Sequence, residues 1–159
     1  MAGSSEGTEM AFEIVVVGPD DTALVHGALN CFAAAFEDSD TYSANRPDRA
    51  YLRGVLAGDS FVCLVALVDG VVVGALAAYV LPKIEQARSE LYIYDLAVIE
   101  SAQRQGVATG LINALKPVAR ARGAWVIYVQ ADDGDEPAVA LYSKLGTRED
   151  VLHFDIPVT

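Results

Sequence analysis

The sequence contains few of the residues that hold metals or disulfide bonds. Its 159 residues include only two cysteines, Cys31 and Cys63, and two histidines, His26 and His153. None of the four falls in a CxxC or zinc-ligand spacing, and both cysteines lie in apolar surroundings. We therefore expect two buried free thiols, no metal site and a reduced, cytoplasmic protein.

Long apolar runs are also absent. No segment approaches the roughly 18–20 uncharged apolar residues that a membrane-spanning helix requires. Residues 1–10 are small and polar and lack the apolar core of a secretion signal, so they are interpreted as a disordered leader. The remaining length suits one domain over residues 11–159, with no internal repeat and no linker.

Basic residues are scarce. The chain contains 11 Lys and Arg but 22 Asp and Glu, which gives a formal net charge of −11. A negative field repels nucleic acids and anionic membranes, so neither is expected as a partner. Residues 131–155 are rich in acids, whereas bases prevail at Arg104, Lys116, Arg120 and Arg122. Two regions of opposite sign predict two ligands of opposite charge.

Apolar periodicity predicts a mixed α/β domain. Asp69-Gly70 between two apolar runs predicts a hairpin, and residues 37–48 are expected to form a polar loop. The expected order, β-α-α-β-β-β-α-β-α-β, combines a central meander with a later βαβ crossover. Strands are expected at 12–17, 60–67, 71–81, 91–98, 125–130 and 151–156, and helices after Asp20, after Asp48, over 107–122 and over 137–145.

The stretch Gln103–Thr109, QRQGVAT, follows a predicted strand and opens a predicted helix. Unpaired N–H groups and the helix dipole favour an anion at such a turn, and Gly106 allows a close approach to the backbone. Neither the Walker nor the Rossmann glycine pattern is present. From these residues alone, the turn is either a phosphate site or a plain helix-capping loop.

Two motifs resemble signatures of the GNAT N-acetyltransferase superfamily. QRQGVA, preceded by Leu96-Ala97-Val98, is similar to the acetyl-CoA signature Q/R-x-x-G-x-G/A. The segment from Asp135 to Gly146 is similar to the second signature, N-x-x-A-x-x-L-Y-x-x-x-G-F, although Asp135 and Thr147 replace the usual Asn and Phe. The resemblance covers residues 12–156. It implies the GNAT fold, a mixed α/β (α+β) fold whose largely antiparallel, twisted central sheet splays at the acetyl-CoA cleft and is flanked by about four helices.

A finer resemblance includes the acceptor side. ALAAYVLPK (75–83), LYIYDLAV (91–98), VIYVQADDGDEPAVALY (126–142) and HFDI (153–156) resemble the small, GNAT-fold aminoglycoside 3-N-acetyltransferases. This resemblance implies direct acetyl transfer from acetyl-CoA, in a ternary complex, to the 3-amino group of gentamicin-type aminoglycosides, which confers antibiotic resistance. A homodimer is a further family expectation.

The same resemblance implies the cofactor contacts. Backbone N–H groups of the QRQGVAT turn would hold the pyrophosphate of acetyl-CoA, and the preceding strand end would pair with its pantetheine arm. The thioester carbonyl would be polarised near the Val98 amide. The implied cofactor-binding residues are Leu96, Ala97, Val98, Gln103, Arg104, Gln105, Gly106, Val107, Ala108 and Thr109.

Two residues are implied in proton transfer. Tyr142 occupies the position of the family's general acid, and a phenol with a pKa near ~10 can protonate the departing thiolate. Asp95 is expected to point into the cleft and to act as the base, directly or through a water, while it also anchors the ammonium. The implied substrate-binding residues are Asp95, Tyr94, Asp132, Asp135, Glu136 and Tyr42.

Two other functions remain open. A GNAT enzyme that acetylates polyamines or another small cationic amine would use the same acid-rich loop. A non-catalytic domain that senses acetyl-CoA would need neither Tyr142 nor Asp95, so the presence of both residues argues against it.

Overall fold

The computed structural model describes residues 9–159, so the leader expected over residues 1–10 lies outside the described part except for its last two residues. The chain divides into two compact units, the first ending at Tyr128 and the second covering Val129–Thr159. The first unit contains four α-helices and nearly all of the β-sheet. The second contains one helix, α5 (Glu136–Leu145).

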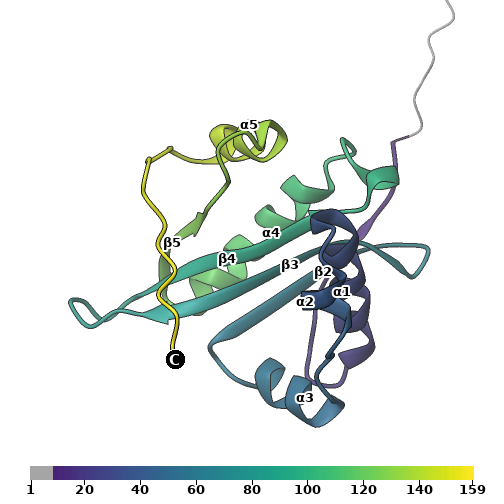
Figure 1. The fold of residues 1–159 in the computed structure, drawn as a ribbon, viewed down its shortest axis with the longest axis horizontal. Helices are drawn as coiled ribbons and strands as arrows, with labels where there is room; N and C mark the ends of the chain where they lie inside the picture. Colours follow the sequence, from purple (N-terminus) through teal and green to yellow (C-terminus); the bar gives the residue numbers. More distant parts are fainter. Residues whose placement is uncertain (1–8) are drawn as a thin grey trace, which may run out of the picture. The chain divides into compact units, whose positions relative to one another are not determined.

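Five strands form one open sheet in the order β1-β2-β3-β4-β5 (Figure 1). The pairs β1–β2, β2–β3 and β3–β4 are antiparallel, which confirms the expected largely antiparallel sheet. The strands are β1 (Glu13–Val16), β2 (Phe61–Val68), β3 (Val71–Pro82), β4 (Ser89–Val98) and β5 (Ala124–Val129).

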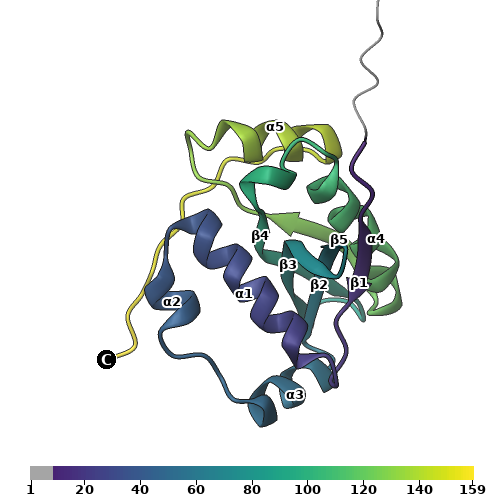
Figure 2. The ribbon, with the colours of Figure 1, turned by 90° about the vertical axis from the view of Figure 1, so that its right-hand side faces the viewer.

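Helices cover both faces of the sheet in the first unit. α1 (Thr22–Phe36) and α3 (Arg49–Ala57) lie on one face, and α4 (Val107–Ala121) lies on the other (Figure 2). The short α2 (Ser39–Ser43) packs beside α1, and a 3-10 turn at Glu100–Ala102 leads from β4 toward α4. The sheet therefore separates two helical layers.

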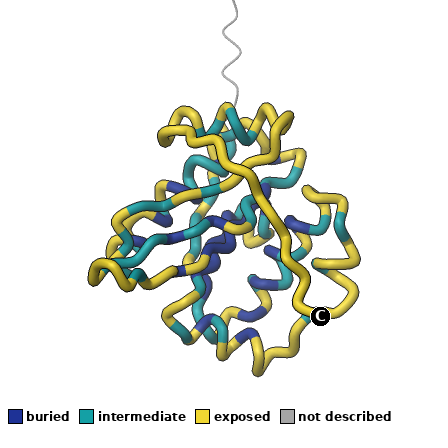
Figure 3. The backbone as a smooth tube through the Cα atoms, turned by 60° about the vertical axis from the view of Figure 1, so that its left-hand side comes forward, coloured by how far each residue is buried: buried dark blue, intermediate teal, exposed yellow. Residues whose placement is uncertain are grey.

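Alternation along the strands gives the sheet two apolar faces. Buried positions follow the strands and the helices that cover them (Figure 3). On the α4 side of the sheet, the side chains of Leu111 and Leu115, which belong to α4 itself, are fully buried. The core under α1 and α3 includes Val25, Ala28, Phe32, Leu52, Leu56, Cys63, Val65, Ala75, Ala77 and Ala97.

Two glycines let α4 approach the sheet closely. A Cβ on Gly74 of β3 would lie 2.8 Å from Val107 Cγ1, and a Cβ on Gly110 of α4 would lie 2.9 Å from Phe12 Cε2. Real Cβ atoms do not come this close to neighbouring atoms, so the glycines fix how closely the helix crosses the sheet. Because Val107 is the first residue of α4, the contact also positions the start of the helix.

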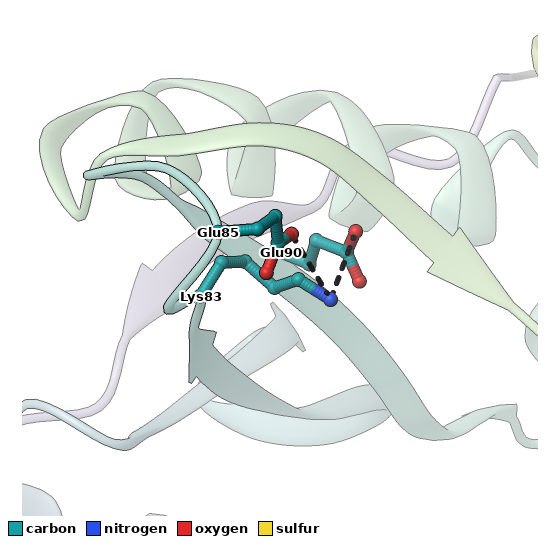
Figure 4. Close-up of polar contacts among 3 residues, drawn as sticks. All are labelled: Lys83, Glu85 and Glu90. Atoms are coloured by element: carbon teal, nitrogen blue, oxygen red, sulfur yellow. Dashed lines mark ion pairs between the residues drawn. The ribbon is translucent and has the colours of Figure 1, made fainter.

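Both connections of the β2–β3–β4 meander are tight. The β2–β3 hairpin turns at Asp69-Gly70 as predicted, with left-handed φ angles of 50° and 78° that suit a two-residue type I′ turn. In the β3–β4 connection, Lys83 Nζ lies 3.5 Å from Glu85 Oε1 and 3.7 Å from Glu90 Oε1 (Figure 4). These partly exposed ion pairs add little stability, and the backbone register holds the strands together.

The predicted strand at 151–156 is wrong. Residues Val151 to Thr159 are all exposed and form no strand within the second unit, every residue of which is described. An alternating apolar run suits a strand, but a strand is stable only when a neighbour supplies hydrogen bonds. Within its own unit this run has no such neighbour, because Val129–Thr159 holds only the last residue of β5.

Two smaller differences concern where helices start. Residues 37–48, expected to be a polar loop, contain α2, because Asp38 caps a helical turn by accepting a hydrogen bond from Thr41 N at 3.0 Å. α1 begins after Asp21 rather than after Asp20. The observed order is therefore β-α-α-α-β-β-β-α-β-α.

Candidate active site

The QRQGVAT turn joins β4 to α4 through a left-handed backbone. Arg104 has φ 58° and Gly106 has φ 81°, and the Gln103 side-chain amide donates a hydrogen bond to the Val98 carbonyl at 3.1 Å. α4 begins at Val107, and its N-cap, Gly106, provides no side-chain hydrogen bond. The N–H groups of the first turn therefore lack the usual capping partner and can bind an anion.

The space around this turn fits a pyrophosphate-bearing cofactor. A Cβ on Gly106 would meet no atom within 4 Å, so a ligand can reach the backbone there. Next to the turn is a cavity of about 370 Å³, whose walls come from α1, the end of β4 and the 3-10 turn. The lining residues are Ala34, Ala35, Val98, Ile99, Glu100 and Gln103. Gln103 uses one of the two lone pairs of the Val98 carbonyl, so this oxygen can still accept one further hydrogen bond from a ligand.

Asp95 lies at an irregularity in β4. Ala77 pairs with Asp95 whereas Ala78 pairs with Ile93, so Tyr94 is an extra residue, a β-bulge. A bulge changes the direction of nearby side chains, and here the half-buried carboxylate of Asp95 meets the side chain of Tyr42. The Tyr42 hydroxyl donates a hydrogen bond to Asp95 Oδ1 at 2.8 Å.

The surroundings of Asp95 favour a basic carboxylate. Burial raises the pKa of Asp95 above its ordinary value, and the hydrogen bond from Tyr42 opposes this shift without cancelling it. The pKa of Tyr42 is raised as well, first by burial and then by the Asp95 carboxylate, so its phenol stays protonated as a donor. The pair therefore combines a charged acceptor with a neutral donor at neutral pH.

Aromatic contacts and a backbone anchor hold Tyr42 in place. Its ring lies 5.7 Å from both the Phe32 and the Phe36 rings of α1. Arg46 Nε donates to the Tyr42 carbonyl at 3.2 Å. The segment predicted as a polar loop thus delivers a phenol to Asp95, and Tyr42 lies near both Asp95 and Tyr94.

Next to Asp95 the sheet carries five aromatic rings in sequence, which we call the aromatic row. Ring centroids lie 5.3 Å apart for Phe61–Tyr79, 5.8 Å for Tyr79–Tyr94, 5.7 Å for Tyr94–Tyr92 and 4.8 Å for Tyr92–Tyr128. Sequence reasoning assigned only Tyr94 of these to the site. The available signal was an aromatic residue in each of the four predicted strands from β2 to β5.

In the second unit, Tyr142 lies on α5 and is partly buried. Desolvation raises the pKa of Tyr142 to about 12, and the Asp135 carboxylate contributes in the same direction. A phenol in this environment remains protonated at neutral pH, which is the form that a general acid requires.

The predicted acidic residues cluster just before α5. Asp135 caps the helix, because its Oδ1 accepts a hydrogen bond from Ala138 N at 3.2 Å. Glu136 helps to line a shallow cavity of about 340 Å³, together with Asp133, Gly134, Val139, Ala140 and Arg148. The Asp135 side chain therefore has a structural role in addition to any role toward a ligand, and Asp132 precedes it in the same loop.

Outside these sites the cysteines are inert. Cys31 and Cys63 are buried free thiols, as expected, and burial raises the pKa of Cys63 to about 12. Across residues 9–159 no cluster of three or more His, Cys, Asp or Glu side chains could hold a metal ion. Over the same residues no helix has the length and apolar character needed to cross a membrane.

Comparison with known proteins identifies the family. Residues 25–147 match the acetyltransferase (GNAT) family. A solved aminoglycoside acetyltransferase from an uncultured soil metagenomic sample is 54% identical, with 94% of this chain and 100% of that chain covered and a TM-score of 0.92. A second one from such a sample, solved in complex with sisomicin, is 30% identical, with 93% and 97% covered and a TM-score of 0.85.

Curated relatives match over a shorter part of the chain. The N-alpha-acetyltransferase of Sulfurisphaera tokodaii is 34% identical over 96 residues, which cover 54% of this chain and 55% of that protein. The chain thus spans about half the length of the curated relatives it matches. Taken together, the matches show that the chain belongs to the GNAT acetyltransferase family, whose members use acetyl-CoA, and the expected GNAT fold is confirmed.

Proposed function

We propose that this protein transfers an acetyl group from acetyl-CoA to the 3-amino group of gentamicin-type aminoglycosides and so confers resistance to them. The observation that carries the proposal is the Asp95 carboxylate, which a phenol holds beside exposed aromatic rings on the strand that leads into the anion-binding turn. Identity of 54% to an aminoglycoside acetyltransferase along nearly the whole chain supports the choice of acceptor.

The QRQGVAT turn is proposed to bind the cofactor. Uncapped N–H groups from Arg104 to Thr109 receive the pyrophosphate, and backbone groups of Leu96 to Val98 receive the pantetheine arm. Acetyl-CoA supplies the acyl group as a thioester. The amide of Val98 is proposed to donate to the thioester carbonyl as negative charge develops there.

Asp95 is proposed to bind and deprotonate the acceptor amine. Its carboxylate attracts the substrate ammonium and takes its proton, directly or through a water, which frees the nitrogen lone pair for attack. As the new C–N bond forms, the C–S bond breaks, and Tyr142 gives its proton to the departing thiolate. The acetylated nitrogen releases its second proton to solvent, solvent restores the proton of Tyr142, and Asp95 returns its own proton to solvent, so one proton is released per turnover. Because the amine attacks the thioester directly, no acyl-enzyme forms.

Further carboxylates and phenols are proposed to recognise the other amino groups of the substrate. Tyr42 and Tyr94 flank Asp95 in the first unit, and Asp132, Asp135 and Glu136 supply negative charge in the second. A polycation suits a chain with a formal charge of −11. A dimeric, cytoplasmic enzyme is part of the same proposal.

The experiment that tests the proposal is an acetylation assay on a panel of amines. Gentamicin, sisomicin, spermidine and a short peptide with a free N-terminus are each incubated with acetyl-CoA, and thiol release is followed. Mass spectrometry then maps the modified nitrogen. Acetylation of the 3-amino group supports the proposal, whereas turnover of spermidine or the peptide without any aminoglycoside would replace it. Absence of turnover with every amine would favour an acetyl-CoA sensor.

A further inference from the structure

The aromatic row crosses the sheet from β2 to β5 without a gap. Neighbouring strands lie about 4.8 Å apart, so three strand spacings give the row a length of roughly 14 Å. Each ring touches the next through tilted, edge-to-face or stacked geometry, with centroids no more than 5.8 Å apart. Such pairs hold each other's orientation, so the row forms a preorganised surface.

Three of the five rings in the row are exposed. Tyr94 is 62% exposed, Tyr79 is 42% exposed and Tyr128 is 37% exposed. Phe61 and Tyr79 pair directly across β2 and β3, and the next pair on the same face, Cys63 and Ala77, is buried in the core under α1 and α3. The row therefore continues this core on the part of the face that α1 and α3 leave uncovered.

Negative charge borders the row. The Asp95 carboxylate is close enough to raise the pKa of Tyr79 and of Tyr92, after the larger effect of burial. Electron-rich ring faces beside a carboxylate attract cations and repel anions.

We propose that the aromatic row binds the rings of the acceptor that do not react. This proposal rests on the proposed function and deepens it: Asp95 anchors the reacting ammonium, while the row stacks against the remaining rings of a multi-ring cationic amino sugar. Apolar ring faces of such a ligand pack on the aromatic faces, and its further ammonium groups gain cation–π contacts. The row thereby selects multi-ring acceptors over small amines that reach only Asp95.

Tyr128 offers the sharpest test, because it ends the row on β5, the strand next to the one that carries Asp95. The Tyr128→Leu variant removes the ring and keeps an apolar side chain. Trp125→Leu is the matched control: Trp125 is also exposed on β5, but it lies an odd number of residues away, on the other face, where Arg88 covers it at 4.2 Å.

The measurement is the ratio of kcat/KM for gentamicin to that for 2-deoxystreptamine, which carries the 3-amino group on a single ring. Tyr128→Leu should lower this ratio about tenfold through KM for gentamicin, without changing KM for acetyl-CoA. Trp125→Leu should leave the ratio at its wild-type value. Equal losses for both acceptors, or an unchanged ratio in the Tyr128 variant, would overturn the proposal.

Binding measurements separate this proposal from the proposed function. Calorimetry with gentamicin reports affinity whether or not acetylation follows. Binding that weakens in Tyr128→Leu but not in Trp125→Leu supports the row, even if no aminoglycoside is acetylated and the proposed function fails. Light scattering of the same variants tests the other occupant: if Tyr128→Leu dissociates an oligomer without changing gentamicin affinity, the row is a subunit interface and the proposal is wrong.

Discussion

The two faces of the sheet come from the same strands but differ in how closely they are packed. Toward α4 the contacts are close and apolar, with glycines at Gly74 and Gly110 where the helix crosses. Toward α1 and α3, half of the face is an apolar core and the other half carries exposed phenols and the Asp95 carboxylate. The strands β3 and β4 therefore carry packing residues on both faces and exposed aromatic residues on one of them.

This difference indicates where substitutions should cost stability and where they should cost activity. At Gly74 and Gly110 the α4 face has no room for a Cβ, so added atoms there force neighbouring groups apart. The aromatic half of the opposite face is open, so changed side chains there can be accommodated without strain. Polar groups on this half are incompletely buried and so remain accessible.

The largest effect is expected for Asp95→Asn. A general base contributes roughly 100- to 10,000-fold to the rate, and we expect kcat/KM for the amine to fall by a factor in this range. KM for acetyl-CoA should change little, because Asp95 lies outside the QRQGVAT turn. Steady-state thiol release with saturating acetyl-CoA measures the loss. Turnover of the Asn variant close to that of the wild type would remove Asp95 as the base.

The same substitution should not cost stability. Burial raises the pKa of Asp95 above that of the unfolded chain, so the folded state disfavours the carboxylate. This cost is absent below the unfolded pKa and fully present once the pH exceeds the folded pKa. At neutral pH the Asn variant should therefore unfold at the same temperature as the wild type or higher, and its relative advantage should shrink as the pH falls. A clear loss of stability at neutral pH would contradict this assignment.

Gly74→Ala should give the opposite pattern on the α4 face. The new Cβ would lie 2.8 Å from Val107 Cγ1 and 3.4 Å from the Ala97 carbonyl oxygen. The clash destabilises the folded state, whereas replacing glycine reduces the entropy of the unfolded chain and offsets part of this cost. The net free energy of unfolding should fall by about 1–2 kcal/mol. Gly54→Ala on exposed α3 is the control: a Cβ there meets nothing within 4 Å and should stabilise by about 0.5–1 kcal/mol. Urea denaturation of both variants checks the difference in sign.

Local signals in the sequence were sufficient for much of this architecture. Asp69-Gly70 determines the hairpin, and Asp48 caps α3 through Tyr51 N at 2.8 Å as expected. The QRQGVAT turn was identified because its glycine and polar donors are contiguous. In each case residues within four positions of one another decide the structure.

Non-local pairing was harder to predict. Without an irregularity, a hairpin that pairs Val68 with Val71 would place Phe61 opposite Ala78. The bulge between Ala66 and Leu67 shifts the register by one, so Phe61 instead meets Tyr79 and the row can form. A one-residue shift exchanges the faces of all later side chains, and no local pattern announces a bulge. The wrongly predicted strand at 151–156 has the same cause, because the alternation of apolar and polar residues does not show which strand, if any, will pair with the segment.

Gly106→Ala should have a smaller effect on activity, and a control variant can separate its effect on acetyl-CoA binding from its effect on backbone strain. Its φ of 81° makes any Cβ cost roughly 1–2 kcal/mol of stability. A methyl group would also stand where the pyrophosphate approaches the backbone, and KM for acetyl-CoA should rise roughly two- to tenfold. Gly70→Ala, with φ 78° in the β2–β3 turn, should show similar strain with an unchanged KM. Equal KM values in the two variants would contradict the role of the turn.

The smallest expected effect belongs to Tyr42→Phe, which removes one hydroxyl from the open face. Its hydrogen bond at 2.8 Å lowers the pKa of Asp95 and partly offsets burial, so its loss should raise that pKa further. The acid limb of the profile of kcat/KM against pH should therefore move to higher pH, while the rate well above this limb falls only a few-fold. Tyr51→Phe, which removes another exposed phenol without a bond to Asp95, should leave the limb in place. A limb that stays fixed in Tyr42→Phe would mean that the phenol orients Asp95 without tuning it.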